Sequence, residues 1–291
     1  MSDALEHLRG GDPDAALAAL QSAVRAAPAE AKHRVFLFQL LAVQGQWDRA
    51  LTQLNVAGEL DAGTLGMVQV YREALGSEAL RAEVFAGRRS PLIFGEPEQW
   101  VALLLEALRL TASGDYAGAE GLRNQAFEQA PTVSGRINGE PFEWIADADS
   151  RLGPVVEIIV NGRYYWVPFH RIVEMRLERP ADLRDLVWLP VEIKWSNGGE
   201  AVGLVPSRYP GSETAADPSL RLARRTEWTE LAAGLFVGRG QRMFATDAAE
   251  YPVMEIETLS FETPDAAVEA EDGTAAMASA AAAGGADDAS A

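Results

Sequence analysis

The segment GDPDAA (residues 11–16) returns as GQWDRA (45–50) and again as GDYAGA (114–119). An alanine follows the leading glycine by five positions in every copy (Ala16, Ala50 and Ala119) and again by twelve (Ala23, Ala57 and Ala126). Proline follows by seventeen positions in two copies, at Pro28 and Pro131. The N-terminal half of the chain therefore carries an internal repeat, whose copies are spaced by one period and by close to two.

This pattern has a physical interpretation as paired helices. Glycine lets the chain turn sharply between two antiparallel helices, and small residues let the helices approach closely. Proline ends the second helix. A helix–turn–helix unit with a period of about 34 residues, as here, is typical of tetratricopeptide repeats. The alternative is a non-repetitive helical bundle whose glycine and alanine spacings agree by chance.

The missing copy falls at about residues 64–98. Residues 67–75 keep helical spacing, and a second helix is predicted over 77–86. The repeat glycine and alanines are absent here, and Gly87–Pro91 interrupts the pattern. We interpret this stretch as a degenerate repeat followed by a loop, with the fourth repeat starting at residues 98–100.

After Pro131 the pattern changes to β structure. Residues 133–138 are predicted to form a linker, and residues 155–160 and 163–167 a hairpin around Asn161-Gly162, a pair that favours a type I′ turn. Further strands are predicted at 172–177, 191–195, 201–205, 226–228, 241–245 and 253–261, with a short helix at 182–187 and a loop at Gly238-Arg239-Gly240. Connections of hairpin length favour a mainly antiparallel sheet.

The predicted fold class is therefore α+β. An N-terminal α-solenoid of tetratricopeptide-like helix pairs (residues 1–131) precedes a mainly antiparallel β-rich domain (132–262). Residues 263–291 are rich in alanine and acidic side chains and contain no basic residue, so we expect a disordered tail.

Composition narrows the classes of function. The formal net charge of −18 disfavours nucleic acid and anionic membrane surfaces as partners. The chain contains no cysteine, which excludes disulfides, thiolate nucleophiles and cysteine-ligated metals. The N-terminus lacks the pattern of a signal peptide, and no stretch of about 18 apolar residues occurs, so a cytoplasmic location is expected.

The sequence holds one weak candidate for a catalytic residue. His170 follows the predicted hairpin, but no Gly-x-Ser-x-Gly motif supplies a nucleophile for it. Two interpretations stay open: a small-molecule-binding or hydrolytic site around His170, or a buried histidine that ties the hairpin to a neighbouring backbone.

The acidic residues Glu143, Asp147 and Asp149 suggest a calcium loop, but the positions that require glycine and glutamate hold Leu152 and Ile158. A polar turn with an internal arginine–carboxylate pair is expected instead. No phosphate-binding glycine motif is present. The prediction is therefore a protein with no catalytic residue, no cofactor and no metal.

In a tetratricopeptide stack, the first helix of each pair lines a concave groove that binds a helix or an extended peptide. The predicted lining residues are Lys32, Val35, Phe36, Gln39, Gln69, Arg72, Leu104 and Leu108. For Val35, Leu104 and Leu108, packing between repeats is an equal alternative. A third possibility is a scaffold that binds through the surface of its β domain and leaves the groove idle.

The junction between the two halves carries a longer motif. The segments EPFEWIADADSRLGP (140–154), NGRYYWVPF (161–169), DLVW (185–188) and YPGS (209–212) resemble the ImpE/TagJ family of type VI secretion accessory proteins, and the resemblance covers about residues 1–262. It implies a non-enzymatic cytoplasmic adaptor. The implied partners are the contractile-sheath small subunit, through its N-terminal helical segment, and the ClpV-type AAA+ ATPase, in sheath assembly or recycling. The family supplies no catalytic residue to transfer.

Overall fold

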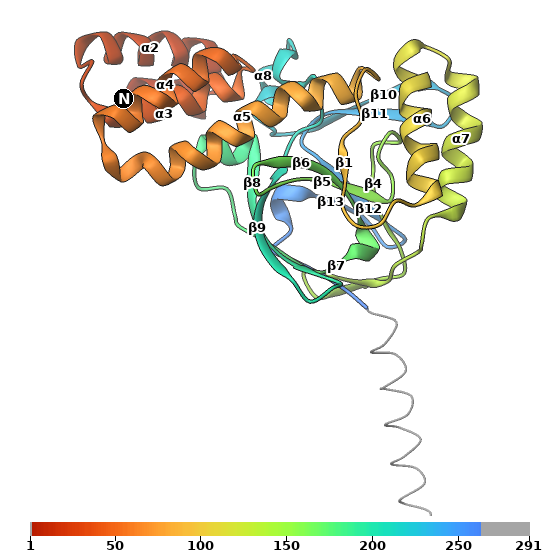
Figure 1. The fold of residues 1–291 in the computed structure, drawn as a ribbon. Helices are drawn as coiled ribbons and strands as arrows, with labels where there is room; N and C mark the ends of the chain where they lie inside the picture. Colours follow the sequence, from red (N-terminus) through yellow and green to blue (C-terminus); the bar gives the residue numbers. More distant parts are fainter. Residues whose placement is uncertain (1, 263–291) are drawn as a thin grey trace, which may run out of the picture.

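The computed structural model describes residues 2–262, and Figure 1 shows a helical region beside a curved sheet. The α+β fold is confirmed: tetratricopeptide-like helices come first and a mainly antiparallel sheet follows. The predicted disordered tail, residues 263–291, lies outside the described residues.

Three helix pairs carry the repeat. They are α1 (Ser2–Arg9) with α2 (Pro13–Ala26), α3 (Ala31–Val43) with α4 (Trp47–Leu60), and α6 (Gln99–Ser113) with α7 (Tyr116–Gln129). The repeat glycines Gly11, Gly45 and Gly114 lie in the three turns with φ of 82°, 66° and 84°, a conformation that glycine adopts without steric cost. Ala16, Ala50 and Ala119 are fully buried. The predicted roles of the repeat glycines in the turns and of the repeat alanines in close packing are therefore confirmed.

The predicted degenerate pair at residues 64–98 is wrong. After the short 3₁₀ helix η1 (Ala62–Thr64), residues Leu65–Phe85 form one continuous helix, α5. Gly76 lies inside it, where a glycine costs about 1 kcal/mol relative to alanine. Burial along the length of α5, from Val68 to Val84, offsets that cost. In Figure 1, α5 runs between the first two pairs and the α6–α7 pair, so the helices do not form one uninterrupted stack.

The main sheet has nine strands in the order β1-β6-β5-β9-β8-β7-β14-β2-β3. Their bounds are β1 (Leu92–Ile93), β2 (Gly135–Ile137), β3 (Glu140–Phe142), β5 (Val155–Val160), β6 (Arg163–Pro168), β7 (Ile172–Leu177), β8 (Trp188–Trp195), β9 (Glu200–Pro206) and β14 (Thr258–Phe261). Neighbours are antiparallel except β1, which runs parallel to β6. Asn161 and Gly162 both have positive φ, as the predicted β5–β6 hairpin requires.

Two smaller sheets complete the domain: β13 (Glu250–Pro252), β12 (Met243–Thr246) and β4 (Ile145–Asp147), and the hairpin of β10 (Thr226–Ala232) and β11 (Leu235–Gly240). The remaining helices are η2 (Phe169–Arg171), η3 (Leu183–Leu186), η4 (Ser212–Thr214), α8 (Pro218–Arg221) and η5 (Val253–Glu255). Three predictions are wrong. Val253–Glu255, expected as the start of a strand over 253–261, forms η5. Gly238–Gly240 belongs to β11, and the expected linker at 133–138 contains β2. β11 pairs with the preceding strand β10 in a hairpin, and β2 pairs with β3 and with the distant β14. Pairing with other strands, rather than local preference, decides both.

A shared apolar core joins the helices to the sheet. Trp188 of β8 packs against Tyr71 of α5 and Trp47 of α4, with ring centroids 5.9 and 6.0 Å apart. Phe85 of α5 packs in the same way against Trp166 of β6, at 5.9 Å. Aromatic pairs at these separations add to the stabilisation that burial provides. The helical region is therefore held against the sheet by large buried side chains.

Arginines from residues 208–224 bind the ends of the first helices. Arg208 donates to the Val43 carbonyl oxygen, 2.7 Å away at the end of α3, and Arg224 donates to the Leu8 carbonyl oxygen, 2.6 Å away near the end of α1. Arg221 pairs with Asp14 in the first turn of α2 at 2.8 Å. The last carbonyls of a helix lack partners within it, so these contacts stabilise the helix ends.

Candidate partner-binding groove

A groove of about 600 Å³ lies between the first helices and the connection from β7 to β8. Helix α3 contributes Ala31, Lys32, Val35, Phe36 and Gln39. These residues recur at helical spacing and therefore share one face of α3. The rest of the lining comes from Leu5 of α1, from Asp61 and Thr64 at the α4–α5 turn, and from Pro180, Ala181, Asp182, Leu183 and Leu186.

The groove wall opposite α3 is the 3₁₀ helix η3, which is stabilised by its cap and by contacts with other segments. Asp182 and Asp185 form a reciprocal capping box at its start. The Asp185 carbonyl oxygen accepts a hydrogen bond from Ser207 Oγ at 3.0 Å. The Arg184 guanidinium lies over the Tyr71 ring, 4.9 Å from its centroid. The groove is thus a composite of helical region and sheet domain, since α3 alone supplies only one wall.

The structure brings four of the eight predicted lining residues together: Lys32, Val35, Phe36 and Gln39. Gln69 and Arg72 are exposed on α5 outside the groove, where Gln69 binds Glu73 and Arg72 binds Asn55. Leu104 and Leu108 are only 1% and 3% exposed, which fits the alternative of packing within the core. The reason is the path of α5, which separates α6 from α3 (Figure 1).

Sequence reasoning missed the second wall of the groove. Residues 180–186 lie in the other half of the chain from α3, and no repeat or motif links the two segments. The predicted short helix at 182–187 is confirmed as η3, but its position against α3 follows from the shared core.

His170 lies at the corner between β6 and β7. Its Nε2 lies 3.0 Å from Glu98 Oε1, and Arg171 Nη2 donates to the same oxygen at 2.8 Å. Burial lowers the pKa of His170, although Glu98 opposes this. The expected bond to a neighbouring backbone is therefore wrong, because the partner is a side chain at the start of α6. The contact ties α6 to the sheet.

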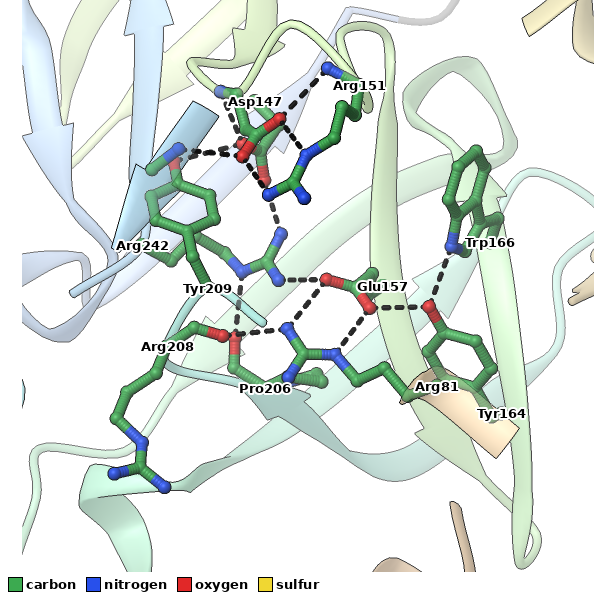
Figure 2. Close-up of polar contacts among 12 residues, drawn as sticks. Arg81, Asp147, Arg151, Glu157, Tyr164, Trp166, Pro206, Arg208, Tyr209 and Arg242 are labelled. Atoms are coloured by element: carbon green, nitrogen blue, oxygen red, sulfur yellow. Dashed lines mark hydrogen bonds and ion pairs between the residues drawn. The ribbon is translucent and has the colours of Figure 1, made fainter. Parts of the chain in front are cut away.

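A buried cluster of charges lies between α5 and the sheet (Figure 2). Glu157 of β5 accepts hydrogen bonds from Arg81 of α5, at 2.7 and 3.0 Å, and pairs with Arg242. Arg242 also pairs with Asp147 of β4. Tyr164 donates to Glu157, which completes the surroundings of that carboxylate.

Each of the two buried carboxylates in this cluster contacts an arginine, and the arginine lowers the carboxylate's pKa against the effect of burial. Burial alone would raise the pKa of Glu157, but Arg81 and Arg242 lower it to about 2. Burial raises the pKa of Asp147 to about 7, with Arg242 acting against it. Glu157 and Asp147 are 0% and 3% exposed, so neither carboxylate faces a cavity. The cluster links α5 to the sheet, and paired buried charges resist separation because either partner left alone is costly.

The acidic junction turn matches its prediction in part. Arg151 pairs with Asp149 at 2.6 Å, which confirms the internal arginine–carboxylate pair, whereas Asp147 pairs with the distant Arg242. Within residues 2–262 no hydrogen bond or ion pair joins Asp147 to His170. In the described chain Asp147 is 3% exposed and pairs with Arg242, whereas His170 pairs with Glu98.

Residues 2–262 contain no group of three or more histidine, aspartate or glutamate side chains placed to hold a metal ion. In the same part of the chain, each helix is too short or too polar to cross a lipid bilayer.

Comparison with known proteins identifies the family. Residues 139–260 match the model of the ImpE protein family, and residues 7–66 match a tetratricopeptide repeat model. The type VI secretion system accessory component TagJ of Pseudomonas aeruginosa is 54% identical over 261 residues, which cover 90% of this chain and 92% of that protein. The crystal structure of protein VPA1032 from Vibrio parahaemolyticus is 25% identical, with a TM-score of 0.80 over 89% of this chain and 97% of the other. This chain is therefore a member of the ImpE/TagJ family.

Proposed function

We propose that this protein is a non-enzymatic, cytoplasmic adaptor of a bacterial type VI secretion system that binds a helical segment of a protein partner. The observation that carries the proposal is the composite groove of α3 and residues 180–186, in a chain 54% identical to a type VI secretion accessory component. Its lining is mainly apolar, and Leu5 at its rim is 41% exposed. Exposed apolar surface in a concave site favours binding of another apolar surface.

A helix suits this groove better than an extended peptide. The walls are the helices α3 and η3, and no strand edge lines the groove within the described residues. An extended peptide would gain no main-chain partners from such walls, whereas a helix satisfies its own backbone groups. The occupant is therefore an amphipathic helix that places its apolar face in the groove.

The proposed partners are the N-terminal helical segment of the contractile-sheath small subunit and the ClpV-type AAA+ ATPase. The name of the Pseudomonas relative supports a role in type VI secretion, and both partners are those that the resemblance to the ImpE/TagJ family implies. In this role the protein acts in assembly or recycling of the sheath. We assign the groove to the sheath segment, because the contact implied for that subunit is a helical segment and the walls of the groove suit a helix.

The experiment is a calorimetric titration of the cognate sheath segment into the intact protein. Ala181→Arg places a long charged side chain in the groove at an exposed position, and should weaken binding at least tenfold. Ala117→Arg, at an exposed position on α7 outside the groove, is the matched control and should bind like the wild type. No binding by the wild type, or equal binding by both variants, would refute the groove as the site.

A further inference from the structure

Gln39 has an unusual position on the floor of the groove. It is 5% exposed and lines the groove together with apolar side chains of α3 and η3. Its amide makes no hydrogen bond within residues 2–262, yet neither amide atom is sealed inside the protein. The amide thus faces the groove with its hydrogen-bonding capacity unused.

Solvent can reach this amide in the open groove, but an apolar helix that covers the groove would bury it without a hydrogen-bond partner, which is unfavourable. Leucine or methionine at this position would line the groove equally well without that cost. Other buried atoms without a partner in the described chain, such as Arg123 Nη1 and Gln241 Oε1, do not line the groove, whereas Gln39 does. The unused amide therefore indicates a partner that arrives with the bound segment.

Lys32 lies on the same face of α3, two turns before Gln39. The other charges of the lining are committed: Asp182 pairs with Arg184 at 2.5 Å, and Asp61 accepts the Gly63 amide at 2.8 Å. Lys32 has neither a hydrogen bond nor an ion pair within residues 2–262. Its ammonium group can therefore form an ion pair with a bound segment, which favours a segment with an acidic side chain at that position.

We propose that the groove selects an amphipathic helix with one hydrogen-bonding side chain in its apolar stripe, opposite Gln39, and an acidic side chain opposite Lys32. This inference rests on the proposed function. Lys32 and Gln39 are two helical turns apart, so the two positions lie about 10 Å apart along α3. A partner helix lying alongside α3 carries its acidic and polar residues at the same two-turn spacing. Gln39 sets the register, as a single polar residue does in an apolar helix interface.

The first test compares Gln39→Met with Gln69→Met in titrations with the sheath segment. Methionine keeps the length of glutamine and removes the amide. We expect Gln39→Met to bind about 3- to 10-fold more weakly, the loss of roughly one hydrogen bond. Gln69 is exposed on α5 outside the groove, and Gln69→Met should bind like the wild type.

Thermal unfolding of the free variants separates recognition from structure. The amide of Gln39 has no partner in the free protein, so Gln39→Met should unfold at the same temperature as the wild type or higher. A merely structural role for Gln39 would lower both the unfolding temperature and the affinity, and that result would overturn the inference.

The charge contact is tested by reciprocal exchange. Lys32→Glu should weaken binding several-fold, and a segment with its facing acidic residue changed to lysine should recover that loss. If Gln39→Met and Lys32→Glu both bind the segment with the affinity of the wild type, this inference is overturned and the proposed adaptor function is unaffected. Failure of the wild type to bind the segment overturns both.

Discussion

Two repeat glycines provide a matched test of how the helical region meets the sheet domain. Gly45 and Gly114 lie at equivalent turns and have similar positive φ, 66° and 84°. A Cβ at Gly45 would lie 2.4 Å from Glu213 Cγ and 2.9 Å from Glu213 Cβ, whereas one at Gly114 would have no atom within 4 Å. Alanine at either position therefore strains the backbone equally, but only Gly45→Ala collides with the sheet domain.

The magnitudes follow from these two terms. Left-handed backbone costs an alanine about 1–2 kcal/mol, and this term is common to both variants. Overpacking against the stem of Glu213 adds about 1–3 kcal/mol to Gly45→Ala alone. The free energy of unfolding should therefore fall about 1–3 kcal/mol further for Gly45→Ala than for Gly114→Ala. For a chain of this size, the difference in Tm is about 2–12 °C.

Equilibrium unfolding in urea and calorimetry of both variants measure the difference. Glu213→Ala in the Gly45→Ala background removes the Cγ contact and should recover part of the excess loss, while the 2.9 Å contact with Cβ remains. Equal destabilisation by Gly45→Ala and Gly114→Ala would refute the reasoning, because it would mean that a Cβ at position 45 does not clash with Glu213.

Three further predictions concern the charged contacts. Glu157→Gln removes a carboxylate shared by two buried arginines and should lower the free energy of unfolding in urea by about 3–5 kcal/mol, whereas Glu83→Gln, in an exposed pair, should change it little. The Glu157 pKa is about 2 in the fold against 4.5 ordinarily, so its contribution, on the order of 3 kcal/mol, is present above pH 4.5 and is lost as pH falls toward 2. Glu157→Gln should show a shallower decline of stability over this pH range, and parallel curves would contradict the assignment. His170→Ala should lower the free energy of unfolding by about 1 kcal/mol through loss of the contact with Glu98. The variant should bind the sheath segment like the wild type, and loss of binding would count against the groove as the site.

Local features of this protein were predictable from the residues alone. The glycines of the repeat mark the three turns because their positive φ is a local requirement, and the alanines mark the close contacts within each pair. Asn161-Gly162 predicted the β5–β6 hairpin for the same reason. Four residues of the groove, all on α3, were found because one helix places them on one face.

Other features depend on contacts between segments far apart in the chain. The ion pairs of Glu157 with Arg81 and Arg242 span 76 and 85 residues, and no spacing in the sequence signals them. Helix α5 stays continuous through Gly76 because residues along its length are buried against α4 and the sheet.

The sequence by itself therefore determined the paired helices, their turns and the central hairpin, since each depends on backbone preferences within a few residues. Only the tertiary structure decided where those helices rest and what completes the groove. The shared apolar core places residues 180–186 against α3, and the free energy of those contacts exists only when distant segments meet.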